Sequence, residues 1–360
     1  MNNSQQPWIY SKWMDSLFII MPPFGVLAFL VLLNQLGWDL TTVTPVVWII
    51  IVLGIDVSHV YSTLFRTYFD KGAREKYKSV FLLVPLFCLI TGILLHSINS
   101  MLFWRCLAYL AVFHFIRQQY GFMRLYSRQE QTSPWKIKLD TIAIYSTMLY
   151  PLVYWHYSGD RKFTWFIDGD FMLAERLESI LFISLVIYAI IMTAFIISEI
   201  QVSIKNKFVN LPKTALITGT ALSWYFGIVF YNGDLTFTAL NVIAHGVPYM
   251  ALVWIFGKKQ ADKSADTGKW QKIVFRPQSL IAYLIPLLFL AYLEEGMWDA
   301  IVWRDHGQFF NAFYLIPCIT EKHWLSIIVP LLSLPQMTHY VLDGFIWRLS
   351  KKEFKAEMRI

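Results

Sequence analysis

The stretch from Pro45 to Phe65 reads PVVWIIIVLGIDVSHVYSTLF. It is long and apolar enough to cross a bilayer as one helix, since about 20 such residues span the hydrocarbon core. Asp56 and His59 interrupt it, and their spacing places them on one face of a helix. Ionisable side chains are rare inside a membrane and usually mark a functional site. The stretch therefore predicts a transmembrane helix that carries chemistry within it.

The composition extends this prediction to the whole chain. Of 360 residues, 56% are hydrophobic and only 15% are charged, and the mean hydropathy is +0.47. We predict an all-α fold, a polytopic transmembrane helix bundle of about ten spans that forms a single domain over residues 1–360. The apolar runs that we expect to be spans are 16–36, 45–65, 79–99, 102–123, 140–157, 179–200, 213–231, 236–256, 278–297 and 324–346.

The distribution of basic residues predicts the orientation. With the N-terminus inside, 24 of the 31 lysines and arginines fall on the inner side of these spans and six on the outer side. Inner loops of membrane proteins are enriched in these residues, so we expect both termini in the cytoplasm. The net charge of +7 favours anionic membrane lipids as partners, with no nucleic acid. We expect an integral, multi-pass protein of the bacterial inner (cytoplasmic) membrane.

Four histidines lie at a similar depth on four of these runs, and all four runs pass from outside to inside. They are His59, His114, His245 and His339. Counting from the basic residue that follows each one, and at about 1.5 Å per residue, the four imidazoles lie roughly 10–20 Å inside the cytoplasmic boundary. A shared metal ion would explain this coincidence. Hydrogen bonding between helices is the alternative for any single member.

Each of these histidines has a polar partner on its own helix face, three or four residues away. The partners are Asp56, Gln118, Asn241 and Asp343. A metal-ligating imidazole commonly donates its other N–H to a carboxylate, amide or carbonyl group. The two aspartates could instead bind the metal directly. This donor set suits iron, with zinc and manganese as alternatives, and the three cysteines have no metal-like spacing.

Three further residues are candidates for catalysis. Tyr61 and Tyr340 lie close in sequence to two of the histidines and could donate hydrogen bonds to a bound oxygen species, although core packing is the alternative role for both. Arg117 lies one turn after His114, where it could bind an anionic head group or neutralise one of the two aspartates.

Histidines placed singly on separate spans resemble the Brp/Blh family of membrane carotene-cleaving dioxygenases. The stretches that carry the resemblance are DVSHVYST (56–63), HFIRQQYG (114–121), NVIAHGVPY (241–249) and THYVLDG (338–344). The nearest counterpart of the family's Pro-His-Gly-x-x-Asp box is His245-Gly246, with Ala244 before it and Tyr249 in place of Asp. The resemblance implies a membrane enzyme that holds iron through intramembrane histidines.

Together these observations favour a non-haem metal enzyme that oxidises a hydrophobic small molecule. Its substrate would be an isoprenoid, carotenoid or acyl lipid that reaches the site from the bilayer. The sequence contains no phosphate-binding loop, dinucleotide fingerprint or nucleophile elbow, and no HxxxH box of membrane desaturases. Two alternatives remain open. The first is a proton- or metal-coupled transporter that uses the His/Asp pairs, and the second is a non-catalytic assembly protein of the membrane.

Overall fold

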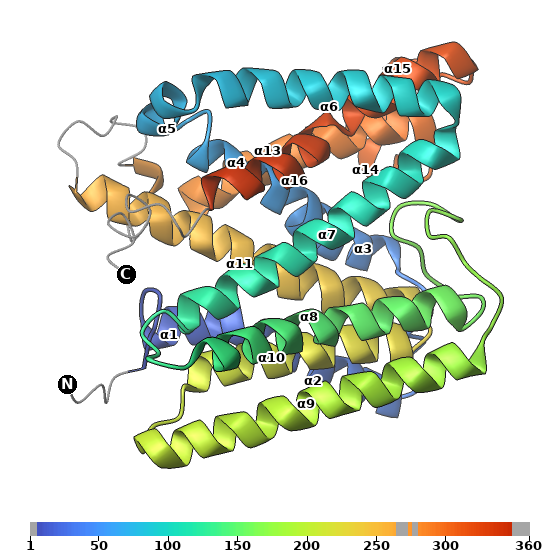
Figure 1. Cartoon of the computed structure of the whole chain (residues 1–360). Helices are drawn as coiled ribbons and strands as arrows, with labels where there is room; N and C mark the ends of the chain where they lie inside the picture. Colours follow the sequence, from blue (N-terminus) through green and yellow to red (C-terminus); the bar gives the residue numbers. More distant parts are fainter. Residues whose placement is uncertain (1–5, 264–272, 276–279, 348–360) are drawn as a thin grey trace. The chain divides into compact units, whose positions relative to one another are not determined.

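The computed structural model describes residues 6–263, 273–275 and 280–347, and these form helices with no strand among them, which confirms the predicted all-α fold. Figure 1 shows the helices in chain order. Their bounds are α1 (Lys12–Asp15), α2 (Pro22–Gln35), α3 (Pro45–Trp48), α4 (Ser58–Arg66), α5 (Lys71–Lys76), α6 (Lys78–Ile98), α7 (Ser100–Tyr126), α8 (Pro134–Tyr157), α9 (Glu178–Asn206), α10 (Leu211–Trp224), α11 (Asp234–Lys263), α13 (Leu280–Trp298), α14 (Gly307–Phe310), α15 (Lys322–Leu332) and α16 (Leu334–Ile346).

Five further segments have a different helical pitch. Four are π-helical: η1 (Ser16–Ile20), η2 (Ile49–Val57), η3 (Tyr225–Phe230) and η4 (Asp299–Trp303). The fifth, η5 (Asn311–Leu315), is a 3₁₀ helix. The segment η2 leads directly into α4, and Ser58 Oγ donates to Leu53 O, five residues back, at 2.8 Å. Short π segments within α-helices occur often at functional sites. Here one ends two residues before His59.

Five helical stretches are long and apolar enough to cross a membrane. They are Pro45–Arg66, Lys78–Ile98, Glu178–Asn206, Asp234–Ala261 and Leu280–Trp303. Two bent pairs, Lys12–Ile20 with Pro22–Gln35 and Lys322–Leu332 with Leu334–Ile346, would raise the number to seven if each pair is one span. These stretches indicate a membrane protein.

The seven stretches correspond to seven of the ten predicted spans. The other three, 102–123, 140–157 and 213–231, lie on α7, on α8, and on α10 with η3. These helices are not among the stretches that are both long and apolar enough to cross a membrane. The number ten and the inward position of both termini therefore stay predictions.

Capping residues fix where several helices begin. Thr44, Ser133 and Asn210 each accept a hydrogen bond from the backbone N–H three residues further on. A proline follows each cap within two residues. Side-chain caps satisfy the first free N–H groups of a helix, and proline suits the first turn because it has no N–H to satisfy. The sequence thus encodes the starts of α3, α8 and α10 locally.

The described helices group into two compact units. The first takes its residues from Met1–Val43 and Val112–Pro248, and the second from Thr44–Ala111 and Tyr249–Arg359. Helices α7 and α11 each contribute residues to both units. The prediction of one domain stays a prediction.

In the first unit, α8 is the central helix. It packs along α9 and against α10, and α10 also packs on α2 (Figure 1). Only 11% of the most apolar window of α9 is buried, so most of this apolar helix faces outward. This exposure is what a helix in contact with lipid would have.

In the second unit, α6 packs against α15 and α16, and α13 packs against α4. Helix α6 approaches its neighbours closely at Gly92, where a Cβ atom would lie 2.9 Å from Pro330 and 3.2 Å from the end of Met337. His96, one turn further along α6, lies 3.3 Å from Ser326 Oγ. Small residues permit such close packing of membrane helices.

A buried network of charges holds α8, α9 and α10 together in the first unit. Lys213 Nζ lies 2.8 Å from Glu130 Oε1, 2.7 Å from Glu199 Oε1 and 3.3 Å from Asp140 Oδ2. Lys136 bonds to Asp140 and Glu199 as well. Only 1% of the Lys213 side chain is exposed. Each carboxylate here depends on a lysine, because burying an unpaired charge is very unfavourable.

We expect Lys213→Met to lower the free energy of unfolding by about 3–5 kcal/mol, since Glu130 loses its cation and the buried Asp140 and Glu199 are left with Lys136 alone. The measurement is chemical denaturation in mixed micelles, followed by circular dichroism. Lys205→Met removes an exposed lysine of α9 and is the matched control. Equal stability of the two variants would contradict the role of the network.

Candidate metal centre

Two of the four histidines form a pair in the second unit. His59 on α4 and His339 on α16 have ring centroids 5.0 Å apart, with the rings at 78°. Both residues are 1% exposed. Tyr249 on α11 packs edge-on against both rings, at 5.8 Å and 4.9 Å. The pair is therefore enclosed on one side by an aromatic residue with a polar end.

The other two histidines form a similar pair in the first unit. His114 on α7 and His245 on α11 have ring centroids 5.0 Å apart, with the rings at 80°. Phe115 stacks on His245 at 3.5 Å and 10°, and Trp165 packs edge-on against Phe115. This pair lies against apolar aromatic rings, whereas the pair in the second unit lies among hydroxyl and carboxyl groups.

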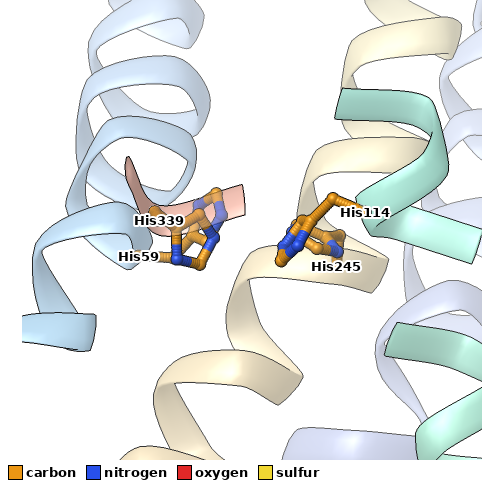
Figure 2. Close-up of side chains that lie close together, drawn as sticks. All are labelled: His59, His114, His245 and His339. Atoms are coloured by element: carbon orange, nitrogen blue, oxygen red, sulfur yellow. The ribbon is translucent and has the colours of Figure 1, made fainter. Parts of the chain in front are cut away.

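Each of the four histidines offers one ring nitrogen to a single group, and these nitrogens all lie within 4.8 Å of one another. All four residues are buried. Figure 2 shows the four rings, which come from four different helices. The predicted histidines thus lie together, and the group could hold a metal ion.

The donor set fits a transition metal. Ligand atoms held at about 2.0–2.2 Å from one ion lie roughly 3–4 Å apart, so movements of about 1 Å would suffice. Neutral imidazoles suit iron, zinc, copper and manganese to different degrees, and no thiolate joins the group. The four nitrogens do not select one metal.

A chain of hydrogen bonds surrounds His339. Its Nδ1 lies 2.7 Å from Thr63 Oγ1, which lies 2.9 Å from the Tyr249 hydroxyl. That hydroxyl donates to Asp343 Oδ1 at 2.6 Å. Asp343, the partner expected from the sequence, lies 3.7 Å from His339 Nδ1. The direct partner of the imidazole is therefore Thr63, and the carboxylate is linked to it through two hydroxyl groups.

His59 has a comparable arrangement. Its Nδ1 lies 3.3 Å from the carbonyl oxygen of Ile55 and 3.7 Å from Asp56 Oδ1. The aspartate is close enough for an ion pair but too far for a good hydrogen bond. The carbonyl oxygen of Ile55 is the nearer of the two, because it lies one helical turn before His59 and points along the helix toward that residue.

The amides of Gln118 and Asn241, the other two predicted partners, donate to backbone oxygens and not to imidazole nitrogens. Gln118 donates to the backbone oxygen of His245 at 2.9 Å. Asn241 donates to the backbone oxygen of Phe237 at 2.9 Å. The amides therefore bind backbone carbonyls, and Gln118 fixes the position of His245 through its main chain.

Pro248 explains why a side chain of α7 donates a hydrogen bond to the backbone of α11. Because proline has no N–H, Pro248 cannot donate to Ala244 O, one turn back. Gln119 supplies the missing donor, with Nε2 3.3 Å from Ala244 O. Its Oε1 accepts from Thr220 at 3.2 Å. Gln119 thus satisfies the carbonyl next to His245 and connects α7, α10 and α11 within the first unit.

A small polar pocket adjoins His245. Its polar lining comes from Gln119, Thr220, Ser223, Asn241 and His245. The Asn241 residue is 4% exposed, and its Oδ1 has no hydrogen-bond partner among the described residues. The pocket has room for about one water molecule.

The three predicted catalytic residues lie in different surroundings. Tyr61 lies beside the carboxyl group of Glu294 on α13, and the Tyr340 ring packs at 5.5 Å on that of its neighbour His339. Arg117 is exposed, donates to the Tyr145 hydroxyl at 2.7 Å and covers the Tyr120 ring. Long basic side chains readily extend to the surface, and the side chain of Arg117 does so here.

Two groups of polar residues near the histidines were not predicted from the sequence. Thr63 lies one turn after His59 on the same helix face, and this spacing could have indicated its role. Hydroxyl groups are common in membrane helices, however, so the spacing alone did not single it out. Glu294 and Glu295 interact electrostatically with Asp56 in the second unit. Their position as two adjacent carboxylates inside an apolar run could have indicated a functional role.

The remaining histidines lie apart from the group. His156 Nδ1 lies 2.7 Å from Leu152 O, and the ring of His306 packs at 4.1 Å on Trp48. His323 is exposed beside Glu321. The fourth, His96, is buried and lies 3.3 Å from Ser326 Oγ.

No protein-family model, curated protein or solved structure matches the chain. The resemblance to the Brp/Blh family therefore stays a prediction.

We expect Gln119→Leu to lower the free energy of unfolding by about 1–3 kcal/mol, because a buried carbonyl loses its donor. Thermal or chemical unfolding of the purified protein would measure the loss. Gln201→Leu, at an exposed position of α9, is the matched control and should change stability little. A Gln119 variant as stable as that control would contradict this role.

Proposed function

We propose that this protein is a membrane-embedded enzyme with a non-haem metal centre, iron in the first instance, that oxidises a hydrophobic small molecule. His59, His114, His245 and His339 would hold the metal. The observation that carries the proposal is the convergence of four buried ring nitrogens within 4.8 Å of one another. Four imidazoles rarely gather inside an apolar protein without a shared ligand.

A redox metal in this group would supply oxygen activation, which all-nitrogen donor sets support when a coordination position is open. The protein's own contribution is to hold the four rings and to exclude water. The four histidines are between 1% and 4% exposed. Phe115 and Trp165 cover His245 with apolar surface on one side. A hydrophobic substrate, such as an isoprenoid, carotenoid or acyl lipid, suits such surroundings.

The other predicted residues take supporting roles in this proposal. Asp56 and Asp343 would act as outer partners of His59 and His339, since each lies 3.7 Å from its ring nitrogen. Tyr340 would supply a hydroxyl group near His339, and Tyr61 would supply one beside Glu294. Arg117, exposed beside Tyr145, suits an anionic lipid head group better than a buried carboxylate.

A second candidate function rests on the carboxylates of the second unit. Asp56, Glu294 and Glu295 interact with one another within stretches that could cross a membrane. Intramembrane carboxylates often carry protons in transporters. A proton- or metal-coupled transporter would use these groups with the histidines, and measurements of product formation and of uptake separate it from an enzyme.

We expect the purified protein to hold about one transition-metal ion per chain. Replacing any of His59, His114, His245 or His339 by asparagine should remove most of it, because each supplies a ligand. Elemental analysis by mass spectrometry measures the content, and electron paramagnetic resonance identifies iron. His96→Asn is the buried control and His323→Asn the exposed control, and both should keep the metal.

Two results would contradict the metal centre. The first is a carefully prepared wild-type protein without stoichiometric metal. The second is full metal content in the variants of either histidine pair. If the four variants lose only stability, the residues serve helix association, as in an assembly protein.

With its metal in place, the protein should consume oxygen when supplied with membrane lipid extracts that contain the substrate class. The expected result is loss of an isoprenoid, carotenoid or acyl lipid and gain of an oxidised product, measured by an oxygen electrode and mass spectrometry. His245→Asn should abolish both signals. Proton-driven uptake into proteoliposomes, with no product formed, would instead favour the transporter.

A further inference from the structure

The segment that joins α8 to α9, residues 158–177, forms a cap segment that is bound to the first unit at several points (Figure 1). Arg161 donates to the backbone oxygen of Ile228 in η3. The backbone N–H of Lys162 donates to Asn232 Oδ1 at 2.8 Å. The cap segment is therefore held against η3 and the turn that follows it.

A buried carboxyl group fixes the turn in the middle of the cap segment. Asp170 is 1% exposed, and its Oδ2 accepts from the backbone N–H groups of Phe166 at 2.5 Å and Ile167 at 3.1 Å. Backbone N–H groups inside a folded chain need acceptors, and here one side chain serves two of them. The backbone immediately after Trp165 therefore follows a defined path.

Trp165 packs against aromatic side chains of two helices. Its ring lies 5.1 Å from that of Phe115 on α7 and 5.6 Å from that of Phe237 on α11, with the planes at 73° in both pairs. Within the cap segment, Phe171 lies 6.1 Å from Trp165 and stacks on Trp155 of α8 at 4.0 Å. Trp165 thus connects the cap segment with α7 and α11.

Phe115 contacts both Trp165 and a predicted metal ligand. Its ring stacks on the imidazole of His245, with centroids 3.5 Å apart and an angle of 10° between the planes. Phe115 is 5% exposed and His245 is 1% exposed. Both nitrogens of an imidazole lie in the plane of the ring, so a contact that fixes this plane also fixes where the nitrogens point.

We propose that Trp165 is a positioning residue for His245. It keeps the Phe115 ring in place, and that ring holds the imidazole plane in the orientation that metal binding needs. The inference rests on the metal centre proposed above. Replacing Trp165 by a small residue would leave a cavity beside Phe115, and surrounding side chains shift toward such a cavity. Phe115 would then turn, and its stack on His245 would loosen.

The first test needs no metal. In the full-length protein, metal-free and in detergent, NMR of ¹³C-labelled histidine reports the ring protons of His245. They lie over the face of the Phe115 ring, whose ring current shifts their signals upfield. His245→Gln identifies these signals by their loss, and Phe115→Leu gives their position without the stack.

We expect Trp165→Ala to move the His245 signals toward their position in Phe115→Leu. Trp165→Phe keeps an aromatic ring and should leave them near the wild-type position. Signals of His245 that stay at the wild-type position in Trp165→Ala would overturn the proposal, whatever the metal content of the protein.

The second test measures affinity, by titration of the metal-free protein with Co²⁺ against a chelator. Trp165→Ala should bind about 10-fold more weakly, the loss typical of residues that orient a ligating imidazole, and Trp165→Phe should bind like the wild type. The visible spectrum of bound Co²⁺ should also change in Trp165→Ala, because it depends on ligand geometry. Trp104→Ala removes a buried tryptophan of the second unit and is the control. It should leave affinity unchanged even if stability falls.

The outcomes separate the two proposals. A wild type that binds no Co²⁺ overturns the metal centre, while the NMR signals still decide whether Trp165 orients His245. A wild type that binds Co²⁺, with Trp165→Ala binding equally tightly, overturns the positioning role alone. An equal loss of affinity in Trp104→Ala overturns it as well. If Trp165→Ala fails to fold, Trp165→Leu, which fills more of the space without a ring, takes its place in both tests.

Discussion

An imidazole taken out of water needs a new partner for each of its two nitrogens. In an apolar helical protein those partners are few: a backbone carbonyl, a hydroxyl, a carboxyl group or a metal ion. In the second unit, both histidines of the pair lie near such groups. His339 is bonded to Thr63, and His59 lies near the carbonyl of Ile55. In the other pair, the aromatic face of Phe115 covers His245. The helices are arranged so that four such rings are brought together rather than dispersed.

The same requirement governs the backbone of α11. Pro248 leaves the carbonyl of Ala244 without its helical donor, and an amide from α7 takes over that bond. The carbonyl of Ala244, which lacks its helical donor, and the side chain of His245 are therefore held in place by the same neighbouring helix. A helix that lacks one backbone hydrogen bond beside His245 needs a donor from a neighbouring helix, and this bond also helps to fix where the ring lies.

The sequence predicted the helical class and the gathering of the histidines because both depend on local patterns. Apolar runs report their length directly, and the distance from each histidine to the next basic residue reports its depth. The roles of Thr63 and Tyr249 could not be predicted, since His339 lies 276 positions from Thr63 in the chain. The amides of Gln118 and Asn241 donate to backbone carbonyls, and side-chain spacing alone does not predict these bonds. Glu294 and Glu295 were overlooked because apolarity averaged over a window conceals two polar residues.

The π-helical segment Ile49–Val57 has a consequence for how this part of the chain can change. Each residue of an α-helix turns the chain by roughly 100°, so adding or deleting one residue there would rotate His59 away from its neighbours. Exchanging one aliphatic side chain for another in the same segment would not. The spacing between Pro45 and His59 is therefore under stricter control than the identity of the residues that fill it. Sequence changes during evolution should therefore keep the number of residues in this segment and vary the identity of its aliphatic side chains.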